Sequence, residues 1–192
     1  MIILASSSPR RQNLLRHLGV TFEVDASDVE EIIPEGSSPQ EAVEELARQK
    51  AEVVAGRHPD EVVLAADTIV VLDGVVLGKP DSEADAKRML RALAGRTHAV
   101  YTGVALVHRA SGRVAVDHEK TLVTFSQLSD DEIDEYVASG SPLDKAGAYG
   151  IQDDRGTLFV CHLDGDYYNV MGLPASKVYR MAREHFPDVR IF

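Results

Sequence analysis

The sequence predicts an α/β protein built around one curved, partly antiparallel sheet. Strand-like and helix-like segments are mixed along the whole chain of 192 residues, which is typical of such an architecture. Two short turns, Asp73-Gly74 and Ser111-Gly112, each join two apolar runs and therefore predict hairpins. No composition break marks a linker, so we expect one domain over residues 1–192, although two tightly joined lobes fit this length equally well.

The helix starts carry clear local signals. Ser8 can cap a helix that has Pro9 at its first position and Gly19 at its end. Capping boxes begin two others, at Ser38-Pro39-Gln40-Glu41 and at Ser129 with Glu132. The expected helices run from 9 to 18, from Ser38 to Gly56, from 83 to 94, from Ser129 to Gly140 and from Pro174 to before Pro187. The expected strands are 2–5, 62–72, 75–77, 100–107, 114–125 and 158–163, with a further strand signal at Val170 and an ordered loop at 144–152.

Composition excludes several classes of protein. The net charge of −11, from 31 acidic and 20 basic residues, disfavours a nucleic-acid partner. No apolar run is long enough to span a membrane, and the start at Met1 lacks a basic leader. The single cysteine, Cys161, excludes an internal disulfide and favours a cytoplasmic location. We expect Cys161 to be a small buried apolar side chain in a strand.

The N-terminal strand, the run Ser6-Ser7-Ser8 and the following helix form the first candidate site. Free backbone N–H groups at a helix start attract anions, and serine hydroxyls add donors. Arg10 and Arg11 lie in the first turn, where a cation opposes the helix dipole by roughly 0.3–1 kcal/mol. A bound phosphate would reverse that sign. The alternative is a pair of solvated arginines at a helix end.

Asp67 interrupts an otherwise apolar strand from residue 62 to residue 72. A carboxylate in such a run is paired, bound to a metal, or placed at a cleft. It could alternatively be a structural group that accepts backbone N–H bonds. Thr68 follows it and could bind a ligand or satisfy local backbone.

Other charged residues give weaker signals. Lys50 falls on the apolar stripe of its helix, where it could neutralise phosphate or extend to solvent. Lys79 and Lys145 lie in Gly-containing loops, and most such lysines are solvated. The pair Glu30-Glu31 could reach a metal or form a solvated acidic patch. The seven histidines show no zinc-binding spacing, and neither a Walker A loop nor a Rossmann fingerprint occurs.

Read together, six segments occur in an informative order. They are Leu4-Ala5-Ser6-Ser7-Ser8-Pro9-Arg10-Arg11, Ala66-Asp67-Thr68, Gly78-Lys79-Pro80, Thr97-His98 with Tyr101-Thr102-Gly103, the segment 144–152, and Asn169-Val170-Met171-Gly172-Leu173-Pro174. This set strongly resembles the Maf family of nucleotide pyrophosphatases, also named for septum formation inhibition. The resemblance covers Ile3 to about Tyr179.

The resemblance implies an inosine-triphosphatase-like α/β fold of two lobes with a central cleft. It also implies hydrolysis of a nucleoside triphosphate to the monophosphate and pyrophosphate, with a divalent cation, Mg²⁺ or Mn²⁺, and a possible homodimer. The family's catalytic aspartate matches Asp67, and its metal-associated acid matches Glu31, with Asp67 also near the metal. The positions implied to bind substrate match Ser8, Arg10, Arg11, Lys50, Thr68, Lys79 and Gln152, of which Arg10, Thr68 and Gln152 are linked to substrate choice.

The segment from Asp144 to Gln152 resembles the branch of the family that acts on dTTP and UTP. The glutamine amide offers a donor and an acceptor that could meet the O4 and N3–H edge of thymine or uracil. Two departures from this branch are Ser141, where relatives often have Glu, and Asp153, where glycine is common. The alternatives are the same chemistry on 7-methyl-GTP or a noncanonical purine nucleotide, or a nucleotide-binding regulator of septum formation.

Overall fold

The computed structural model describes residues 1–29, 31–152, 155–189 and 191–192. Within these residues, seven strands form one sheet in the order β2-β1-β3-β5-β6-β7, and β4 pairs with β3. The strands are β1 Ile2–Leu4, β2 Phe22–Val24, β3 Val62–Leu72, β4 Val75–Leu77, β5 Thr97–His108, β6 Arg113–Phe125 and β7 Val160–Asp164. The helices are α1 Pro9–His17, α2 Pro39–Arg57, α3 Glu83–Leu93, α4 Asp130–Ala138, α5 Gly156–Phe159, α6 Tyr167–Val170 and α7 Ala175–His185, with short 3-10 turns η1 Arg109–Ser111, η2 Ser141–Asp144 and η3 Ala146–Ala148.

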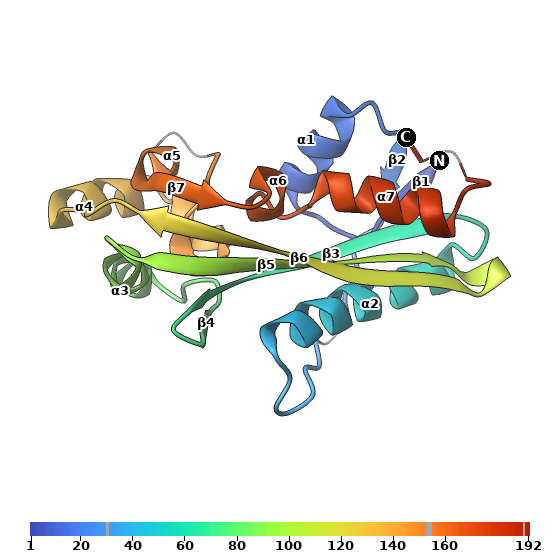
Figure 1. Cartoon of the computed structure of the whole chain (residues 1–192), viewed down its shortest axis with the longest axis horizontal. Helices are drawn as coiled ribbons and strands as arrows, with labels where there is room; N and C mark the ends of the chain where they lie inside the picture. The colour runs from blue at the N-terminus through green and yellow to red at the C-terminus, as the bar shows by residue number, and fades with distance from the viewer. Residues whose placement is uncertain (30, 153–154, 190) are drawn as a thin grey trace. The chain divides into compact units, whose positions relative to one another are not determined.

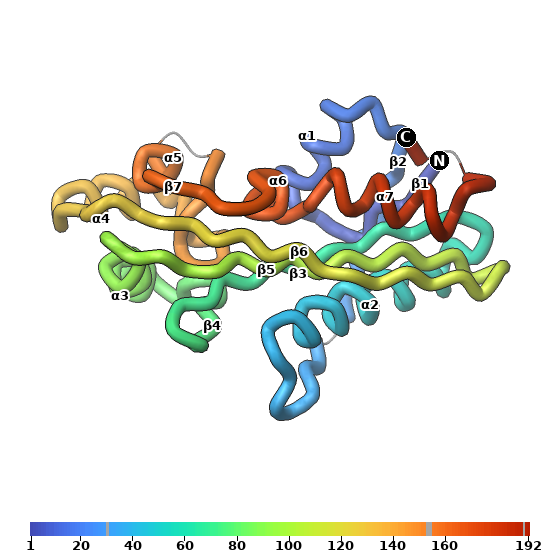
Figure 2. The backbone as a smooth tube through the Cα atoms, in the orientation of Figure 1, coloured from blue at the N-terminus to red at the C-terminus, as the bar shows by residue number. Residues whose placement is uncertain are grey.

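The sheet is mixed, as the sequence predicts. β1 pairs in parallel with both β2 and β3, and the parallel step to β3 uses α2 as its crossover helix. β4 returns antiparallel to β3 after the Asp73-Gly74 turn, where both residues have positive φ. β5 and β6 run back along each other after η1 (Figure 2), and β7 pairs antiparallel with β6. The predicted mixed α/β class is therefore confirmed.

The chain forms two compact units. The first comprises Met1–Asp67, Thr102–Glu119 and Gly172–Phe192, and the second comprises Thr68–Tyr101 and Lys120–Met171. Three long strands, β3, β5 and β6, contribute residues to both units. Each unit has its own apolar core, which agrees with the expectation of two lobes.

In the first unit, α2 and α7 lie on opposite sides of the strands (Figure 1). The core on the α2 side contains Ala47, Ala51 and Val54 from the helix with Val63 and Ala65 from β3. Gly103 on β5 permits a very close approach, because a Cβ added there would lie 2.0 Å from the backbone oxygen of Val43. The small residues of α2 thus place this helix, and its Lys50, directly against the sheet.

The core of the second unit is aromatic. Phe125 packs edge-on against the rings of His98 and Tyr149, with ring centroids 5.1 and 4.7 Å apart. Tyr136 and Phe159 form another edge-on pair at 5.2 Å. Such pairs add to the free energy of burial and fix ring orientations. The helices α3 and α4 pack together and are joined by an ion pair between Lys87 and Asp134.

Most predicted helix boundaries are confirmed, including both capping boxes. The expected side-chain cap at Ser8 is wrong, because Ser8 occupies the N-cap position of α1 but its side chain makes no capping hydrogen bond. β2 was not predicted, since its three residues are too few to show an apolar period.

Three predictions near the C-terminal end are also wrong. Leu158 lies in the one-turn helix α5 rather than in a strand, and Val170 ends the helix α6. Apolar residues in one-turn helices carry no period that distinguishes them from strand residues. Cys161 is exposed rather than buried, because β7 is the last strand in the sheet order. Within the described residues, no helix combines the length and the apolar character needed to cross a membrane.

We expect stability to depend on pH through His98. Burial lowers the pKa of His98 from 6.5 to about 4. Between these values the unfolded chain binds the extra proton and the folded chain does not. The free energy of unfolding therefore carries no penalty from His98 above pH 6.5, and it falls as the pH drops toward 4. The loss attributable to this group is about 3 kcal/mol. Denaturant unfolding at a series of pH values measures it.

The matched control is His162→Gln, which changes an exposed histidine on β7. It should keep the pH slope of the unfolding free energy, whereas His98→Gln should flatten it. An unchanged slope in His98→Gln would show that other groups cause the acid sensitivity.

Candidate functional site

Two carboxylates share one ammonium in the first unit. Nζ of Lys50 lies 2.5 Å from Oδ1 of Asp67 and 2.7 Å from Oε1 of Glu31. The side chains of Lys50 and Asp67 are 15% and 14% exposed, and that of Glu31 is 52% exposed. The attraction between Lys50 and Asp67 is therefore strong, because little water screens it. The attraction between Lys50 and Glu31 is weaker, because Glu31 is in contact with solvent. These are three of the predicted site residues, brought together from α2, β3 and the segment before α2.

Arg11 joins this group from α1. Its Nε donates to the carbonyl oxygen of Gly172 at 2.7 Å, and Nη1 donates to Oγ of Ser6 at 3.0 Å. Burial lowers the pKa of Arg11 below its usual value, and the negative charges of Asp67 and Glu31 offset part of this shift. A guanidinium stays charged under such conditions. The structure thus holds a fixed cation in the electrostatic field of the two carboxylates.

The start of α1 presents the remaining residues that were predicted in the first unit. Arg10 is half-buried, and its charge also lowers the pKa of Arg11. Ser8 is half-buried, and its backbone N–H donates to Oγ of Ser6 at 3.3 Å. Two adjacent arginines at a helix start repel each other and oppose the helix dipole. An anion at this position would relieve both effects.

Three predicted residues belong to the second unit. Thr68 is half-buried on β3, directly after Asp67. Lys79 is exposed in the segment that follows β4. Gln152 is also exposed, at the end of a buried loop that contains Tyr149 and Ile151. The predicted departure at Asp153 lies outside the described residues, as does Glu30, while Ser141 begins η2.

Sequence reasoning assigned no individual role to Ser6 and Gly172, which hold the side chain of Arg11. Ser6 is buried two residues after the end of β1, and its position in a serine run just before a helix was a usable signal. Gly172 acts through its backbone oxygen, which no side-chain pattern can indicate. Its place in the segment 169–174 was visible only through the resemblance.

Carboxylate oxygens are the ligands that Mg²⁺ and Mn²⁺ prefer. Glu31 and Asp67 fit this requirement, because both already converge on one cationic atom, Nζ of Lys50. A second group with metal-ligand chemistry lies elsewhere in the same unit. The ligand atoms of Glu44, Asp117 and His118 lie within 4.8 Å of one another. Asp117 is already paired with Lys177 at 2.9 Å, which reduces its availability.

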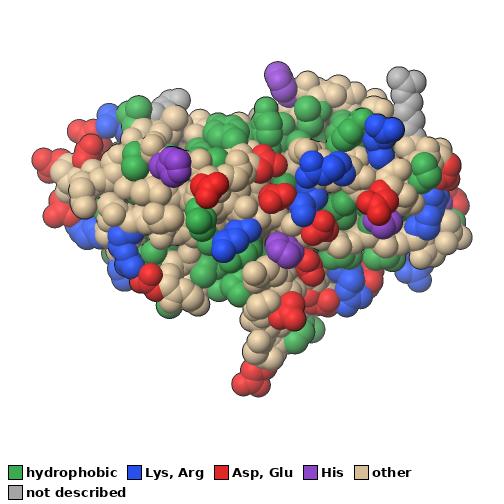
Figure 3. Space-filling model, in the orientation of Figure 1, with side chains coloured by type: hydrophobic (Ala, Val, Ile, Leu, Met, Phe, Trp, Pro, Cys, Tyr) green, Lys and Arg blue, Asp and Glu red, His purple; other side chains and the backbone are tan. Residues whose placement is uncertain are grey.

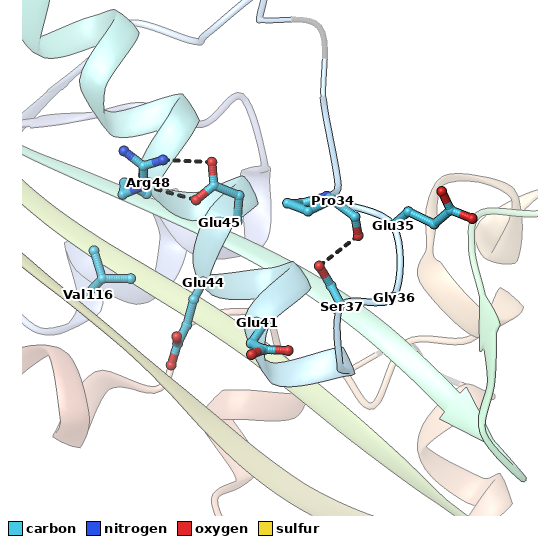
Figure 4. A pocket seen from close by; sticks show the side chains of 9 residues that line it. All are labelled: Pro34, Glu35, Gly36, Ser37, Glu41, Glu44, Glu45, Arg48 and Val116. Carbon is cyan, nitrogen blue, oxygen red and sulfur yellow. Dashed lines mark hydrogen bonds and ion pairs between the residues drawn. The ribbon is translucent and has the colours of Figure 1, made fainter.

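A cavity of about 560 Å³ lies beside the first half of α2. Figure 4 shows its lining, in which the carboxylate of Glu45 meets the guanidinium of Arg48. The lining side chains are Pro34, Glu35, Gly36, Ser37, Glu41, Glu44, Glu45, Arg48 and Val116. Four glutamates against one arginine would repel a triphosphate, and the cavity contains none of the predicted site residues.

The exposed surface carries both signs of charge. In the view of Figure 3, acidic side chains are interspersed with basic ones. Many of these are paired, such as Arg57 with Asp25 at 2.7 Å and Arg48 with Glu52 at 2.7 Å. Exposed pairs of this kind contribute little to stability. The partly buried group around Lys50 is therefore electrostatically distinct from the ordinary surface.

The family described as Maf-like protein matches residues 1–185. A protein of Bacillus cereus strain AH820 named dTTP/UTP pyrophosphatase is 53% identical over 188 residues, which cover 98% of this chain and 97% of that relative. Proteins of the same name from Bacillus thuringiensis subsp. konkukian strain 97-27 and from Bacillus anthracis are 53% and 52% identical, with the same coverage.

Two solved structures are more distant. The Staphylococcus aureus Ham1 protein has a TM-score of 0.48 at 20% identity and covers 65% of this chain and 71% of its own. A HAM1 protein from Coxiella burnetii has a TM-score of 0.48 at 22% identity and covers 66% and 73%. The family match and the bacillary relatives, in contrast, extend over nearly the whole sequence. This chain belongs to the Maf family.

Proposed function

We propose that the protein hydrolyses dTTP and UTP to the nucleoside monophosphate and pyrophosphate. The observation that carries this proposal is the convergence of Glu31, Lys50 and Asp67, with Arg11 in the same electrostatic field. Such a group combines a carboxylate with cations that can balance phosphate charge. The name dTTP/UTP pyrophosphatase, shared by relatives that are 52–53% identical, supports the same reaction.

In the proposed reaction, Asp67 acts as the general base. Its carboxylate is mostly buried and is oriented by Lys50 at 2.5 Å, so it can hold a water molecule and accept its proton as that water attacks the α-phosphorus. The bridging P–O bond between the α- and β-phosphates breaks, and pyrophosphate leaves. Arg11 is kept in place by Gly172 and Ser6. Arg10, Arg11 and Lys50 offset the charge of the phosphate chain, and Ser8 with Lys79 supplies further donors.

A divalent cation, Mg²⁺ or Mn²⁺, would be held by Glu31 and Asp67. When bound, it would stabilise negative charge on phosphate oxygens. These two carboxylates suit the ion because both lie within ion-pair distance of one atom, Nζ of Lys50, and are therefore close to each other. Asp67 is thus proposed both to lie beside the metal and to receive the proton from water.

Base selection is proposed to involve Gln152, with Arg10 and Thr68. A glutamine amide offers one donor group and one acceptor, which match O4 and N3–H of thymine or uracil. The exposed position of Gln152 leaves its amide accessible to a nucleotide. A site built to pair with these groups rejects bases that lack them, because its polar atoms would be left unpaired.

We extend the proposal to location and partners. The single cysteine and the nucleotide substrate favour the cytoplasm. The charge of −11 disfavours binding to nucleic acid. A homodimer is proposed from the resemblance to the family alone.

A panel of triphosphates tests the function directly. With Mg²⁺ or Mn²⁺ present, we expect dTTP and UTP to release pyrophosphate at least about tenfold faster than 7-methyl-GTP, dITP and CTP. A chelator should abolish the release, and added metal should restore it. A regulator that only binds nucleotides would release no pyrophosphate from any of them, and faster release from a purine would reassign the substrate.

Replacing the general base tests the mechanism. Asp67→Asn should lower kcat by roughly 10²–10⁴-fold, because an amide cannot accept the proton. The fold should persist, since Glu31 still pairs with Lys50. Steady-state pyrophosphate release and far-UV circular dichroism measure the two effects. The matched control is Asp73→Asn in an exposed hairpin turn, and equal activity in both variants would remove Asp67 from the base role.

Arg11→Lys tests the role of the fixed guanidinium. A lysine lacks the planar fork that donates both to Gly172 and to Ser6. We expect KM for dTTP to rise about tenfold, which corresponds to about 1.4 kcal/mol. Arg16→Lys changes an exposed arginine on the same helix and should leave KM unchanged. Indistinguishable KM values for the two variants would argue against phosphate binding by Arg11.

A further inference from the structure

The loop that leads to Gln152 is unusually buried and constrained. Residues from Gly147 to Ile151 are all buried, whereas Gln152 is exposed. Ala148 has a positive φ of 60° and is fully buried. A non-glycine residue in this region of backbone space is uncommon and persists only when its surroundings hold it there.

Three consecutive residues before Gln152 are each fixed by a polar side chain. The hydroxyl of Tyr149 is 2.8 Å from Nε2 of His98. The backbone N–H of Gly150 donates to the hydroxyl of Tyr136 at 3.1 Å. The hydroxyl of Thr157 donates to the carbonyl oxygen of Ile151 at 2.7 Å. These anchors come from β5, α4 and α5, so they converge on the loop from three separate elements.

Steric contacts close the remaining space around the loop. A Cβ added to Gly156 would lie 2.4 Å from the backbone oxygen of Gly150. A Cβ added to Gly147 would lie 3.0 Å from Val70. The backbone N–H of Gly147 also donates to the carbonyl oxygen of Gly78 at 3.0 Å, directly before Lys79. The backbone before Gln152 therefore has little room to shift.

The bond between His98 and Tyr149 is sheltered by the aromatic core. Both rings pack edge-on against Phe125. Burial lowers the pKa of His98 to about 4 and raises the pKa of Tyr149, so both groups are neutral near pH 7. Nδ1 of His98 has no hydrogen-bond partner within the described part of the chain. An orphaned buried polar atom costs free energy, so among the described residues the contact with the Tyr149 hydroxyl is the hydrogen bond that this buried imidazole ring makes.

We propose that His98 and Tyr149, assisted by Tyr136 and Thr157, are positioning residues that set base selectivity by fixing the backbone from which Gln152 projects. This inference rests on the proposed function. It adds to that function the residues that fix the position of the Gln152 amide. The residues act through Gln152 and do not touch the nucleotide. Binding sites need such rigid support because a small displacement of a polar group weakens its discrimination.

The test is a double-mutant cycle with Tyr149→Phe and Gln152→Ala. Tyr149→Phe keeps the ring and removes only the hydroxyl. We expect it to lower the ratio of kcat/KM for UTP over CTP by roughly tenfold, mainly through KM for UTP. Thr157→Val, which removes a different anchor of the same loop, should change the ratio in the same direction. In the Gln152→Ala background, Tyr149→Phe should change the ratio no further, because both act through one amide.

The matched control is Tyr179→Phe, which removes the hydroxyl of an exposed tyrosine on α7. It should leave the ratio unchanged. If the wild type releases no pyrophosphate from either nucleotide, the proposed function fails. If the wild type is active and Tyr149→Phe keeps the wild-type ratio, or if the two substitutions are additive, the positioning role is overturned. An equal loss of kcat on every nucleotide would assign Tyr149 a general structural role instead.

Discussion

The shared ammonium of Lys50 is the interaction on which the candidate site depends. Glu31 and Asp67 would repel each other if they were brought together without a cation, and Asp67 interrupts a strand that is otherwise apolar. Placing Lys50 between them makes that carboxylate tolerable at a mostly buried position. The same placement keeps a carboxylate oxygen beside positive charge, which is what the proposed reaction uses. In that proposal, the stability of the site and its chemistry depend on the same contact.

The two units differ in the kind of side chain that they bring together. The first unit gathers charge, with Arg11 and Lys50 close to two carboxylates. The second unit holds a strained loop in an aromatic environment and exposes one amide at the end of it, that of Gln152. In the proposed function, charge complementarity suits the triphosphate, which all candidate substrates share. Rigid placement of a neutral amide suits the base, which differs between nucleotides by single donors and acceptors.

Much of the fold could be predicted because its signals are local. Capping boxes and the Asp73-Gly74 turn act over four residues or fewer, so the sequence around α2, α4 and β4 contains the signals that mark where each element begins. Short elements without such signals were missed or misassigned, as with β2 and α5. The prediction that Cys161 is buried was wrong for another reason. The exposure of a residue on an edge strand depends on the order of strands in the sheet.

The candidate site was predictable to a similar extent and for a similar reason. Asp67 is conspicuous as a charge in an apolar run, and Lys50 as a cation on an apolar stripe. The tether of Arg11 to a backbone oxygen of Gly172, 161 positions away in the chain, leaves no trace in the pattern of side chains. The bond between His98 and Tyr149 also joins distant positions, and only the folded chain shows that they meet.

The absence of a side chain at Gly103 limits how the group around Lys50 can vary. Since the helix that bears Lys50 already touches the backbone of β5 there, the spacing between helix and sheet is at its lower limit. Any larger residue at position 103 would push α2 away from β5, and we expect this to increase the distance from Lys50 to Asp67. A residue that belongs to neither partner of the ion pair thereby limits the distance between Lys50 and Asp67.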